Sequence, residues 1–366
     1  MMRAIGSTPC PDPAFWHGRR VLLTGHTGFK GSWLALWLLD LGADLTGLAL
    51  PPDSDPSLFS LLGLERFFNH RLGDIRDAAC LEAVVAETRP EVVLHLAAQP
   101  LVRRAYAEPV ATWATNVMGT IHLLEALRRL DQPCAAVLIT TDKVYHNQEW
   151  LYGYRENDPL GGHDPYSSSK AAAELAIASW RSSYCGSLLH QTPHLRLASA
   201  RAGNVIGGGD WAVDRIVPDA MRALGRGEPI GVRNPRATRP WQHVLEPLGG
   251  YLLLAERLMT SKALATAFNF GPQLEANRSV RELVEEALRH WPGRWVDQGD
   301  PGSPHEASLL NLVIDKAHHQ LGWTPRWNFA TTVERTVRWY RQVEEGKDSA
   351  LDSCRQDIAA YTDSVG

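Results

Sequence analysis

Val21-Leu22-Leu23-Thr24-Gly25-His26-Thr27-Gly28-Phe29-Lys30-Gly31-Ser32-Trp33 is an apolar run that passes into three glycines and then into an apolar helical pattern. This order predicts a strand, a tight turn and a helix. Gly25 would permit the turn, Gly28 would let the backbone approach a pyrophosphate, and Gly31 would let the helix pack closely on the strand. The helix N-terminus would offer free N–H groups to phosphates. Glycines also occur in turns before ordinary packed helices, so the motif predicts a dinucleotide site only in this strand and helix context.

Short apolar runs alternate with helical patterns through the first half of the chain. The runs after the glycines cover 44–50, 90–99, 135–140 and 197–202. This alternation is typical of an α/β protein with a Rossmann-type doubly wound parallel sheet, and it predicts a dinucleotide-binding domain over 15–204.

The regular alternation of apolar runs and helical patterns ends at about residue 205, where glycines and prolines break the chain into shorter segments. We expect a smaller C-terminal α/β substrate lobe, mainly over 205–340, with later segments returning to the first domain. Residues 1–14 and 345–366 are polar or proline-rich and are expected to be loose terminal arms.

The composition argues against several partners. The 366 residues carry a formal net charge of −4, which gives no basic footprint for nucleic acid or an anionic membrane. No apolar run approaches the roughly 20 residues of a transmembrane helix. The five cysteines are scattered without a C-x-x-C pair, which is typical of a reducing cytoplasm. Histidine spacing gives no metal motif, so no metal is expected.

The second apolar run lacks the acidic residue that often binds the ribose hydroxyls of a dinucleotide. It ends in Leu48-Ala49-Leu50, and Asp53 follows only in a loop, so the run leaves NAD and NADP open. Asp74 is placed either to accept a hydrogen bond from an adenine amino group or to cap a helix over 78–88. Small residues at 96–98 would make room for a ligand at the carboxyl end of a strand.

Two groups of candidate catalytic residues lie at the end of a predicted strand and at the start of a predicted helix. Thr141, Asp142 and Lys143 follow one apolar run, and Tyr166 precedes Lys170 by four residues at the opening of an alanine-rich helix. Residues four apart share a helix face, so the ammonium would lower the pKa of the phenol and make it a base. The alternative is a helix-start tyrosine with a solvated lysine.

The chain resembles the extended short-chain dehydrogenase/reductases from about Phe15 to Trp339. The resemblance is carried by the order of four motifs along the chain: the glycine loop, the small residues at 96–98, Thr141-Asp142 and Tyr166/Lys170. The resemblance implies that Thr141 binds a sugar O4 hydroxyl, that Tyr166 is the base for it, and that Lys170 binds the nicotinamide ribose. The implied NAD site comprises Gly25, Gly28, Phe29, Gly31, Asp74, Ile75, Leu96, Ala97, Ala98, Tyr166 and Lys170.

Longer strings are similar to one group within that family, the CDP-glucose 4,6-dehydratases. They cover 15–21, 25–33, 141–143, 152–159, 201–211, 239–247 and 304–307. The chain departs from this group at Thr141, where serine is common, and at Val144, where cysteine is common. The resemblance implies CDP-glucose as the small-molecule nucleotide sugar, an NAD that is reduced and reoxidised within one turnover, and a homodimer or homotetramer.

The same resemblance implies that the pair Asp142-Lys143 supplies the acid and base of the dehydration. Asp142 would protonate the C6 hydroxyl as water leaves, which requires a raised pKa, and Lys143 would take the C5 proton, which requires a pKa lowered from about 10.4. Burial moves both pKa values in these directions, whereas mutual attraction opposes both. The alternative for Lys143 is that it orients or neutralises a neighbour.

Substrate contacts are expected from the second lobe. The predicted residues are Asn204, Arg215, Arg233, Arg239 and His305, with arginine suited to bidentate contacts with a diphosphate.

Two other functions remain open: another extended short-chain reductase acting on a nucleotide sugar, as an epimerase or a dehydratase with a different base, and a non-catalytic cofactor-binding regulator. Loss of catalysis predicts damage to Thr141, Tyr166 or Lys170, and all three are present.

Overall fold

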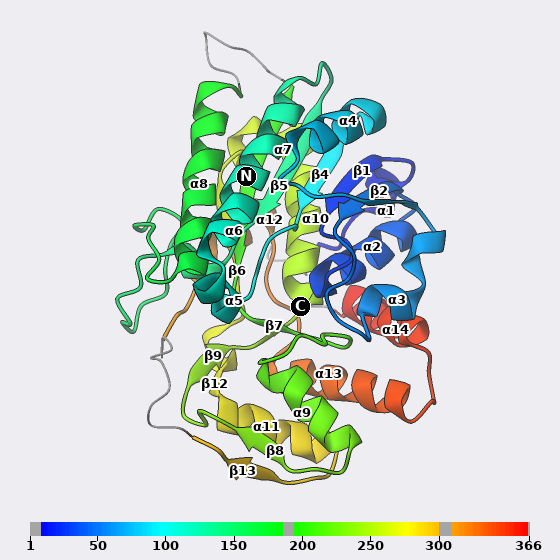
Figure 1. Cartoon of the computed structure of the whole chain (residues 1–366), viewed down its shortest axis with the longest axis vertical. Coiled ribbons are helices and arrows are strands. Elements are labelled where there is room, and N and C mark those ends of the chain that lie inside the picture. The colour runs from blue at the N-terminus through cyan, green and yellow to red at the C-terminus, as the bar shows by residue number, and fades with distance from the viewer. Residues whose placement is uncertain (1–8, 186–193, 300–308, 365–366) are drawn as a thin grey trace.

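The computed structural model describes residues 9–185, 194–299 and 309–364. Its centre is a seven-stranded parallel sheet with the order β11-β6-β5-β4-β1-β2-β3 (Figure 1). The strands are β1 (Arg20–Thr24), β2 (Asp44–Ala49), β3 (Asn69–Leu72), β4 (Val92–His95), β5 (Cys134–Ile139), β6 (Leu195–Ala202) and β11 (Ala267–Phe270). The strand order reverses between β1 and β4, which confirms the predicted doubly wound sheet.

Alternating side chains of the strands enter two hydrophobic cores. Ala135, Val137 and Ile139 of β5 join one core, whereas Cys134, Ala136 and Leu138 join the other. The helices α2 (Phe29–Asp40) and α10 (Leu245–Thr260) cover the first face, and α4 (Ala78–Thr88), α7 (Gly119–Arg128) and α8 (Pro165–Ser183) cover the second. Because both faces are buried, the strands read as nearly continuous apolar runs.

The helical segment between β4 and β5 has three parts from Pro109 onward. These are α6 (Pro109–Trp113), a π-helical turn (Ala114–Met118) and α7, preceded by the short α5 (Val102–Ala107). The π turn contains Asn116, which accepts from the backbone N–H of Gln99 at 2.8 Å and donates to Ser169 Oγ at 2.9 Å. The turn thereby ties the end of β4 to the start of α8.

The second lobe lies below the sheet in Figure 1 and consists of short strand pairs and three helices. The pairs are β7 (Val205–Ile206) with β10 (Gln242–His243), β9 (Thr238–Pro240) with β12 (Asn277–Ser279), and β8 (Ile230–Val232) with β13 (Trp295–Asp297); the helices are α9 (Ile216–Gly225), α11 (Val280–His290) and α13 (Phe329–Glu344). Between these segments, α10, β11 and α12 (Asp315–Leu321) return to the sheet domain.

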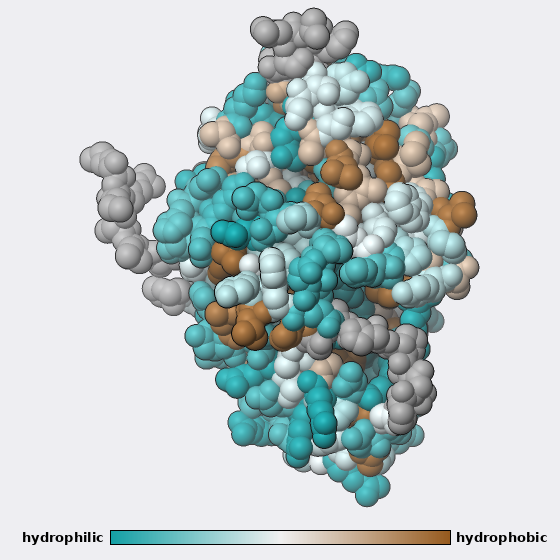
Figure 2. Space-filling view, turned by 90° about the vertical axis from the view of Figure 1, so that its left-hand side faces the viewer, coloured by the Kyte–Doolittle hydropathy of each residue, from teal (hydrophilic) through white to brown (hydrophobic). Residues whose placement is uncertain are grey.

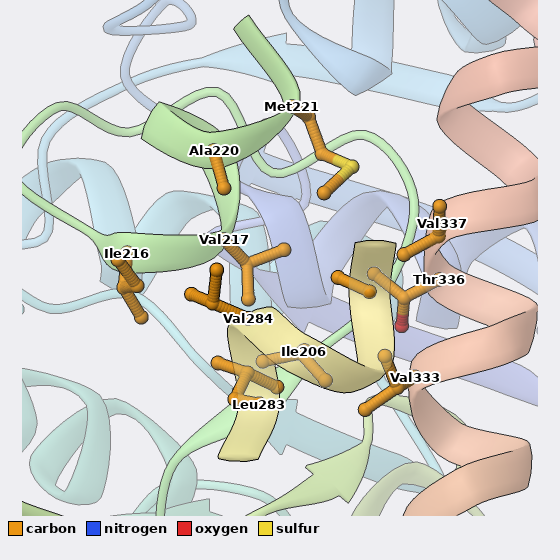
Figure 3. A pocket seen from close by; sticks show the side chains of 11 residues that line it. Ile206, Ile216, Val217, Ala220, Met221, Leu283, Val284, Val333, Thr336 and Val337 are labelled. Carbon is orange, nitrogen blue, oxygen red and sulfur yellow. The ribbon is translucent and has the colours of Figure 1, made fainter. Parts of the chain in front are cut away.

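Helices α9, α11 and α13 enclose the core of this lobe (Figure 3). Apolar side chains and Thr336 line a cavity of about 10 Å³ there. A space of this size holds about one water molecule, so it is a packing void and not a ligand site.

The C-terminal segment differs from the expectation of a loose arm. It forms α14 (Ala350–Asp363), capped by Ser349, and Cys354, Ile358 and Tyr361 are buried in the main core beside α3 (Leu58–Leu62). The hydrophobic spacing of these residues gives the helix a face that packs. At the other end, α1 (Pro13–Trp16) also packs, and the Asp12 backbone N–H donates to Glu256 Oε1 at 2.8 Å.

The remaining elements are short 3₁₀ turns at Leu64–Arg66, Asp142–Val144, Lys262–Leu264 and Leu274–Ala276. Among the residues that the structure describes, no helix has the length and apolar character needed to span a membrane.

Candidate active site

The backbone of the glycine loop between β1 and α2 packs so tightly that there is no space for a side chain at two of its three glycines. Gly25 has a φ of +77°, and a Cβ there would lie 2.6 Å from the backbone N of Ala97. A Cβ on Gly31 would lie 2.1 Å from the Gly25 carbonyl oxygen. Gly28, in contrast, has only that carbonyl within 4 Å of such a Cβ, at 3.5 Å. The open side at Gly28, at the N-terminus of α2, fits a phosphate that approaches the backbone.

The other predicted cofactor residues flank this loop at the carboxyl ends of the strands. Leu96, Ala97 and Ala98 follow β4, and the Ala97 N–H donates to Thr24 Oγ1 at 3.3 Å. Ile75 is buried and packs against Gly119. A Cβ on Gly119 would lie only 2.5 Å from Ile75 Cδ1, so Ile75 occupies the space beside this glycine. These positions agree with a dinucleotide lying across the sheet edge, and their roles stay predictions.

Asp74 does not cap α4, which was one of its two expected roles. The cap is Asp77, whose Oδ1 accepts from the N–H groups of Ala79 and Cys80. Asp74 instead accepts from the backbone N–H and the guanidinium of Arg76, both at 2.9 Å. Hydrogen bonds from Arg76 hold the pKa of Asp74 below its ordinary value, so the carboxylate is an acceptor at neutral pH.

The predicted catalytic residues meet where β5 ends and α8 begins. Thr141 Oγ1 donates to Asp142 Oδ1 at 2.9 Å, and the Thr141 side chain is hydrogen-bonded to Tyr166. All three side chains are buried. Asp164 caps α8 by accepting from the N–H groups of Tyr166 and Ser167, which fixes the tyrosine in the first turn of the helix.

Burial is the main influence on the pKa of Asp142. It raises the pKa of this carboxyl, although the positive charges of Lys143, Lys30 and Arg239 and the Thr141 hydroxyl act to lower it. The direction is the one that a proton donor requires. A Cβ on Gly203 would lie 2.9 Å from Asp142 Oδ2, so the backbone at Gly203 passes directly beside this carboxyl.

The state of Tyr166 differs from the expectation of a lowered pKa. Burial raises the pKa of the phenol to about 12, while the Thr141 hydrogen bond and the charge of Arg215 act to lower it. Without a ligand, desolvation of the phenolate outweighs these favourable interactions. Tyr166 is therefore protonated at neutral pH in the ligand-free chain.

Lys170 is held by the strand beneath it. Its Nζ donates to the Ile139 carbonyl at 3.0 Å, and burial lowers its pKa to about 8, against the opposing charge of Glu174. Glu174 in turn accepts from Thr140 Oγ1 at 2.6 Å, from Ser199 Oγ at 2.8 Å and from Arg201 Nη2 at 2.9 Å. This network fixes the helix that carries Tyr166 and Lys170 against β5 and β6.

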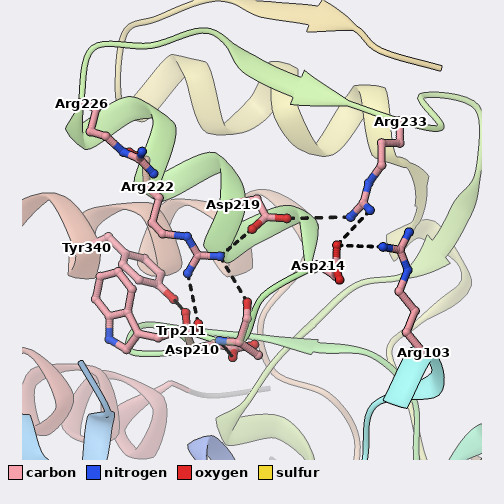
Figure 4. Close-up of polar contacts among 10 residues, drawn as sticks. Arg103, Asp210, Trp211, Asp214, Asp219, Arg222, Arg226, Arg233 and Tyr340 are labelled. Carbon is pink, nitrogen blue, oxygen red and sulfur yellow. Dashed lines mark hydrogen bonds and ion pairs between the residues drawn. The ribbon is translucent and has the colours of Figure 1, made fainter. Parts of the chain in front are cut away.

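The predicted substrate residues fall into different environments. Arg239 is near enough to Asp142 to lower its pKa. Arg215 Nη1 donates to the buried Asp210 Oδ2 at 2.8 Å. Arg233 forms an ion pair with Asp214 (Figure 4). His305 lies outside the described residues.

Sequence reasoning missed Lys30, a further cation in the centre of the site. Lys30 belongs to the glycine loop, and its pKa is lowered to about 8, chiefly by burial and then by Arg215, while Asp142 and Asp210 raise it. Its spacing within the loop gives no sign of this contact, because the fold alone brings 210–215 to the same place. His26, in the same loop, instead lies 2.7 Å from His70 (Nε2 to Nδ1).

Among the described residues, no group of three or more His, Cys, Asp or Glu is arranged to hold a metal ion. The site brings together a buried acid, a phenol and several cations around a glycine loop.

Comparison with known proteins identifies the family. The family model described as GDP-mannose 4,6 dehydratase matches residues 22–336. The chain belongs to this dehydratase family. A relative in it is the CDP-glucose 4,6-dehydratase of Salmonella typhimurium (strain LT2), which is 47% identical over 353 residues, 96% of this chain and 98% of the relative. The dTDP-glucose 4,6-dehydratase of Neisseria gonorrhoeae is 28% identical over 91% of this chain and 98% of its own length.

Solved structures agree with this family. DesIV, the dTDP-glucose 4,6-dehydratase of Streptomyces venezuelae with NAD and TYD bound, is similar with a TM-score of 0.73 and 25% identity, covering 89% of this chain and 98% of DesIV. The UDP-glucose-4-epimerase of Stenotrophomonas maltophila has a TM-score of 0.76 at 21% identity, covering 90% of this chain and 100% of the epimerase, and this likeness concerns the fold alone.

Proposed function

We propose that the chain is an NAD-dependent lyase, a hydro-lyase that converts CDP-D-glucose to CDP-4-dehydro-6-deoxy-D-glucose and water. The observation that carries the proposal is the buried contact of Thr141, Asp142 and Tyr166 beside the glycine loop. The 47% identity to a CDP-glucose 4,6-dehydratase supports the nucleotide base.

The residues around the loop fit NAD. The open side of Gly28 would receive the pyrophosphate, and Asp74 would accept from the adenine amino group, since its carboxylate is ionised. Phe29, Ile75 and Leu96 would pack against the dinucleotide. When bound, NAD supplies the acceptor for a hydride from C4 of the sugar and the donor that returns it to C6.

The chain's own residues move the protons. Thr141 would hold the O4 hydroxyl against Tyr166, which takes its proton while C4 is oxidised. The pKa of about 12 in the ligand-free chain already includes the lowering effect of Arg215, so Tyr166 needs further positive charge to act near neutral pH. Lys170, four residues further along α8, would be the cation that supplies it.

Dehydration then requires an acid at the C6 hydroxyl and a base at C5. Burial raises the pKa of Asp142, which is the direction that an acid requires, and Asp142 would give its proton to the departing hydroxyl. Lys143 would take the C5 proton, which the adjacent 4-ketone acidifies. A Lys143→Met variant that exchanged the C5 proton with solvent deuterium at the wild-type rate would exclude Lys143 as the base.

The nucleotide sugar would be held from the second lobe. Asn204 follows Gly203, which lies beside Asp142, Arg239 is near enough to act on that carboxyl, and Arg215 and Arg233 offer guanidinium groups for the diphosphate. His305 stays a predicted contact.

The deciding experiment offers the purified protein CDP-glucose and, in parallel, dTDP-, UDP- and GDP-glucose, and measures the 4-keto product. We expect turnover of CDP-glucose, with deuterium from C4 recovered at C6 of the same molecule. Tyr166→Phe serves as the inactive control. Turnover of dTDP-glucose alone would overturn the proposed base, and a product epimerised at C4 without loss of water would point to an epimerase.

We also propose that the chain forms a homodimer or homotetramer, as the family resemblance implies. Figure 2 views the side of the molecule on which α8 lies and shows hydrophobic side chains gathered there. The exposed apolar residues on the adjoining α6, π turn and α8 are Val110, Trp113, Met118 and Leu175. Leu175→Glu should lower the molar mass measured by light scattering, and an unchanged mass would exclude this face. The cytoplasmic location likewise stays a prediction.

A further inference from the structure

One carboxylate joins two arginines from different lobes. Asp214, in the loop between β7 and α9, accepts at Oδ1 from Arg103 Nη1 at 3.1 Å and from Arg233 Nη1 at 3.0 Å (Figure 4). Arg103 lies on α5 of the sheet domain, and Arg233 follows β8 of the second lobe. We call these three residues the Asp214 bridge. Two guanidinium groups therefore converge on a single anionic oxygen between the lobes.

The charges around the bridge do not cancel. Arg233 Nη2 also lies 3.9 Å from Asp219 Oδ2, and Asp219 Oδ1 accepts from Arg222 Nη2 at 2.5 Å (Figure 4). The chain of ion pairs thus begins and ends with an arginine and carries one excess positive charge. Each hydrogen bond to Asp214 uses one N–H, whereas a guanidinium has five, so the two arginines retain donors for a larger anion.

The bridge is next in the chain to a residue that acts on the catalytic tyrosine. Asp214 immediately precedes Arg215, whose charge acts on the phenol of Tyr166. On the other side, α5 follows the carboxyl end of β4, the edge of the sheet where ligands of open α/β folds bind. The bridge thus joins the two lobes next to the cation that acts on Tyr166.

The bridge is also weak enough to be replaced. The side chains of Arg103, Asp214 and Arg233 are 67%, 47% and 45% exposed. Ion pairs with this exposure contribute little, because water screens them and the side chains lose entropy. A diphosphate has more charge than a carboxylate and accepts bidentate hydrogen bonds from arginine.

We propose that Arg103 and Arg233 bind the diphosphate of the nucleotide-sugar substrate, and that Asp214 holds the two guanidinium groups together until the diphosphate displaces its carboxylate. This inference rests on the proposed function for the identity of the ligand. It assigns Arg103, which no sequence motif indicated, to substrate binding, and it makes Asp214 a competitor of the substrate.

The test compares variants of opposite expected effect. Arg103→Ala should raise the KM for the nucleotide sugar and the inhibition constant of CDP about tenfold or more, acting on KM more than on kcat. Asp214→Asn should lower both constants, because it removes the competing charge. Arg104→Ala is the matched control, since Arg104 is the next residue on α5 and pairs with Glu108 within the same segment. Inhibition by cytidine, which has no phosphate, should be the same in all variants.

The outcomes separate this inference from the proposed function. If Arg103→Ala and Asp214→Asn both raise KM, the bridge only ties the lobes together and the inference is overturned. It is also overturned if Arg103→Ala changes neither constant, or changes cytidine inhibition equally. If the wild-type chain turns over a different nucleoside diphosphate glucose, the proposed base fails, and the variants are then compared with that sugar and its nucleoside diphosphate. If it turns over none, calorimetric CDP binding to the same variants decides the inference.

Discussion

Replacing Glu174 by glutamine should destabilise the chain strongly, although the side chain keeps its size. Glu174 is 2% exposed and accepts three hydrogen bonds, one of them from Arg201, which is similarly buried. Glutamine can still bond the two hydroxyls, but it leaves the Arg201 charge without its counter-ion. Removing one partner of a buried ion pair costs about 3–5 kcal/mol.

The expected change in melting temperature follows from chain length. At about 2.1 cal/mol/K per residue, 366 residues give an unfolding entropy of about 0.77 kcal/mol/K, so the melting temperature should fall by about 4–6 °C. Differential scanning calorimetry at pH 7 measures this fall. Glu285→Gln is the matched control, because its pair with Arg281 is largely exposed and should cost less than about 1 °C.

The pH dependence gives a second, independent check. Burial works to raise the pKa of Glu174, but the charge of Arg201 and the hydrogen bonds outweigh it and hold the pKa below the ordinary 4.5. A lowered pKa contributes stability above 4.5 that is lost as the pH falls through the folded-state value. The gap between wild type and Glu174→Gln should therefore be full at pH 7 and narrow below about pH 4.5. A gap no larger than that of Glu285→Gln, or one that is constant down to pH 3, would contradict this account of the Glu174–Arg201 pair.

Three further changes test the site. Tyr166→Phe should lower kcat by about 10²–10⁴ at an unchanged melting temperature, measured as 4-keto product, and a smaller loss would contradict its role as base. Because burial raises the pKa of Asp142, the rate that depends on its protonated form should fall as the pH rises through that pKa, and Asp142→Asn should lose both most of the rate and this pH limb; an unaltered pH profile would exclude it as the acid. Gly31→Ala would place a Cβ 2.1 Å from a backbone oxygen of the loop and should weaken NAD binding at least about tenfold by calorimetry, whereas Gly225→Ala, with its nearest atom at 3.5 Å, should not.

Local patterns were enough to predict much of the fold. The apolar runs and the glycine spacing predicted the parallel sheet and the turn at Gly25, because both depend on neighbours within a few residues. Asp74 was one candidate cap of α4 by sequence, and the structure gives the cap to Asp77, three residues on; local capping signals are easily shifted along a polar run. The packing of α14 was missed, since its amphipathic face becomes evident only against the partner surface that it covers.

The protonation of the site required the tertiary structure. The spacing of Tyr166 and Lys170 predicted a lowered pKa for the phenol, yet burial raises it to about 12. Sequence spacing gives the distance between two groups on one helix, but desolvation depends on every segment that covers them. The same holds for Lys30, whose neighbours Asp210 and Arg215 are about 180 residues away along the chain.

The sequence alone therefore determined the class of fold and the glycine turn, because these are carried by short-range periodicity and by residue type. The resemblance of its motifs to a known family indicated the candidate acid, base and lysine. The tertiary structure decided which cations surround Asp142, how far burial opposes the ionisation of Tyr166, and that Arg103 and Arg233 meet at Asp214. Charge interactions and desolvation act through space between segments that are remote in sequence, and only the folded chain fixes those distances.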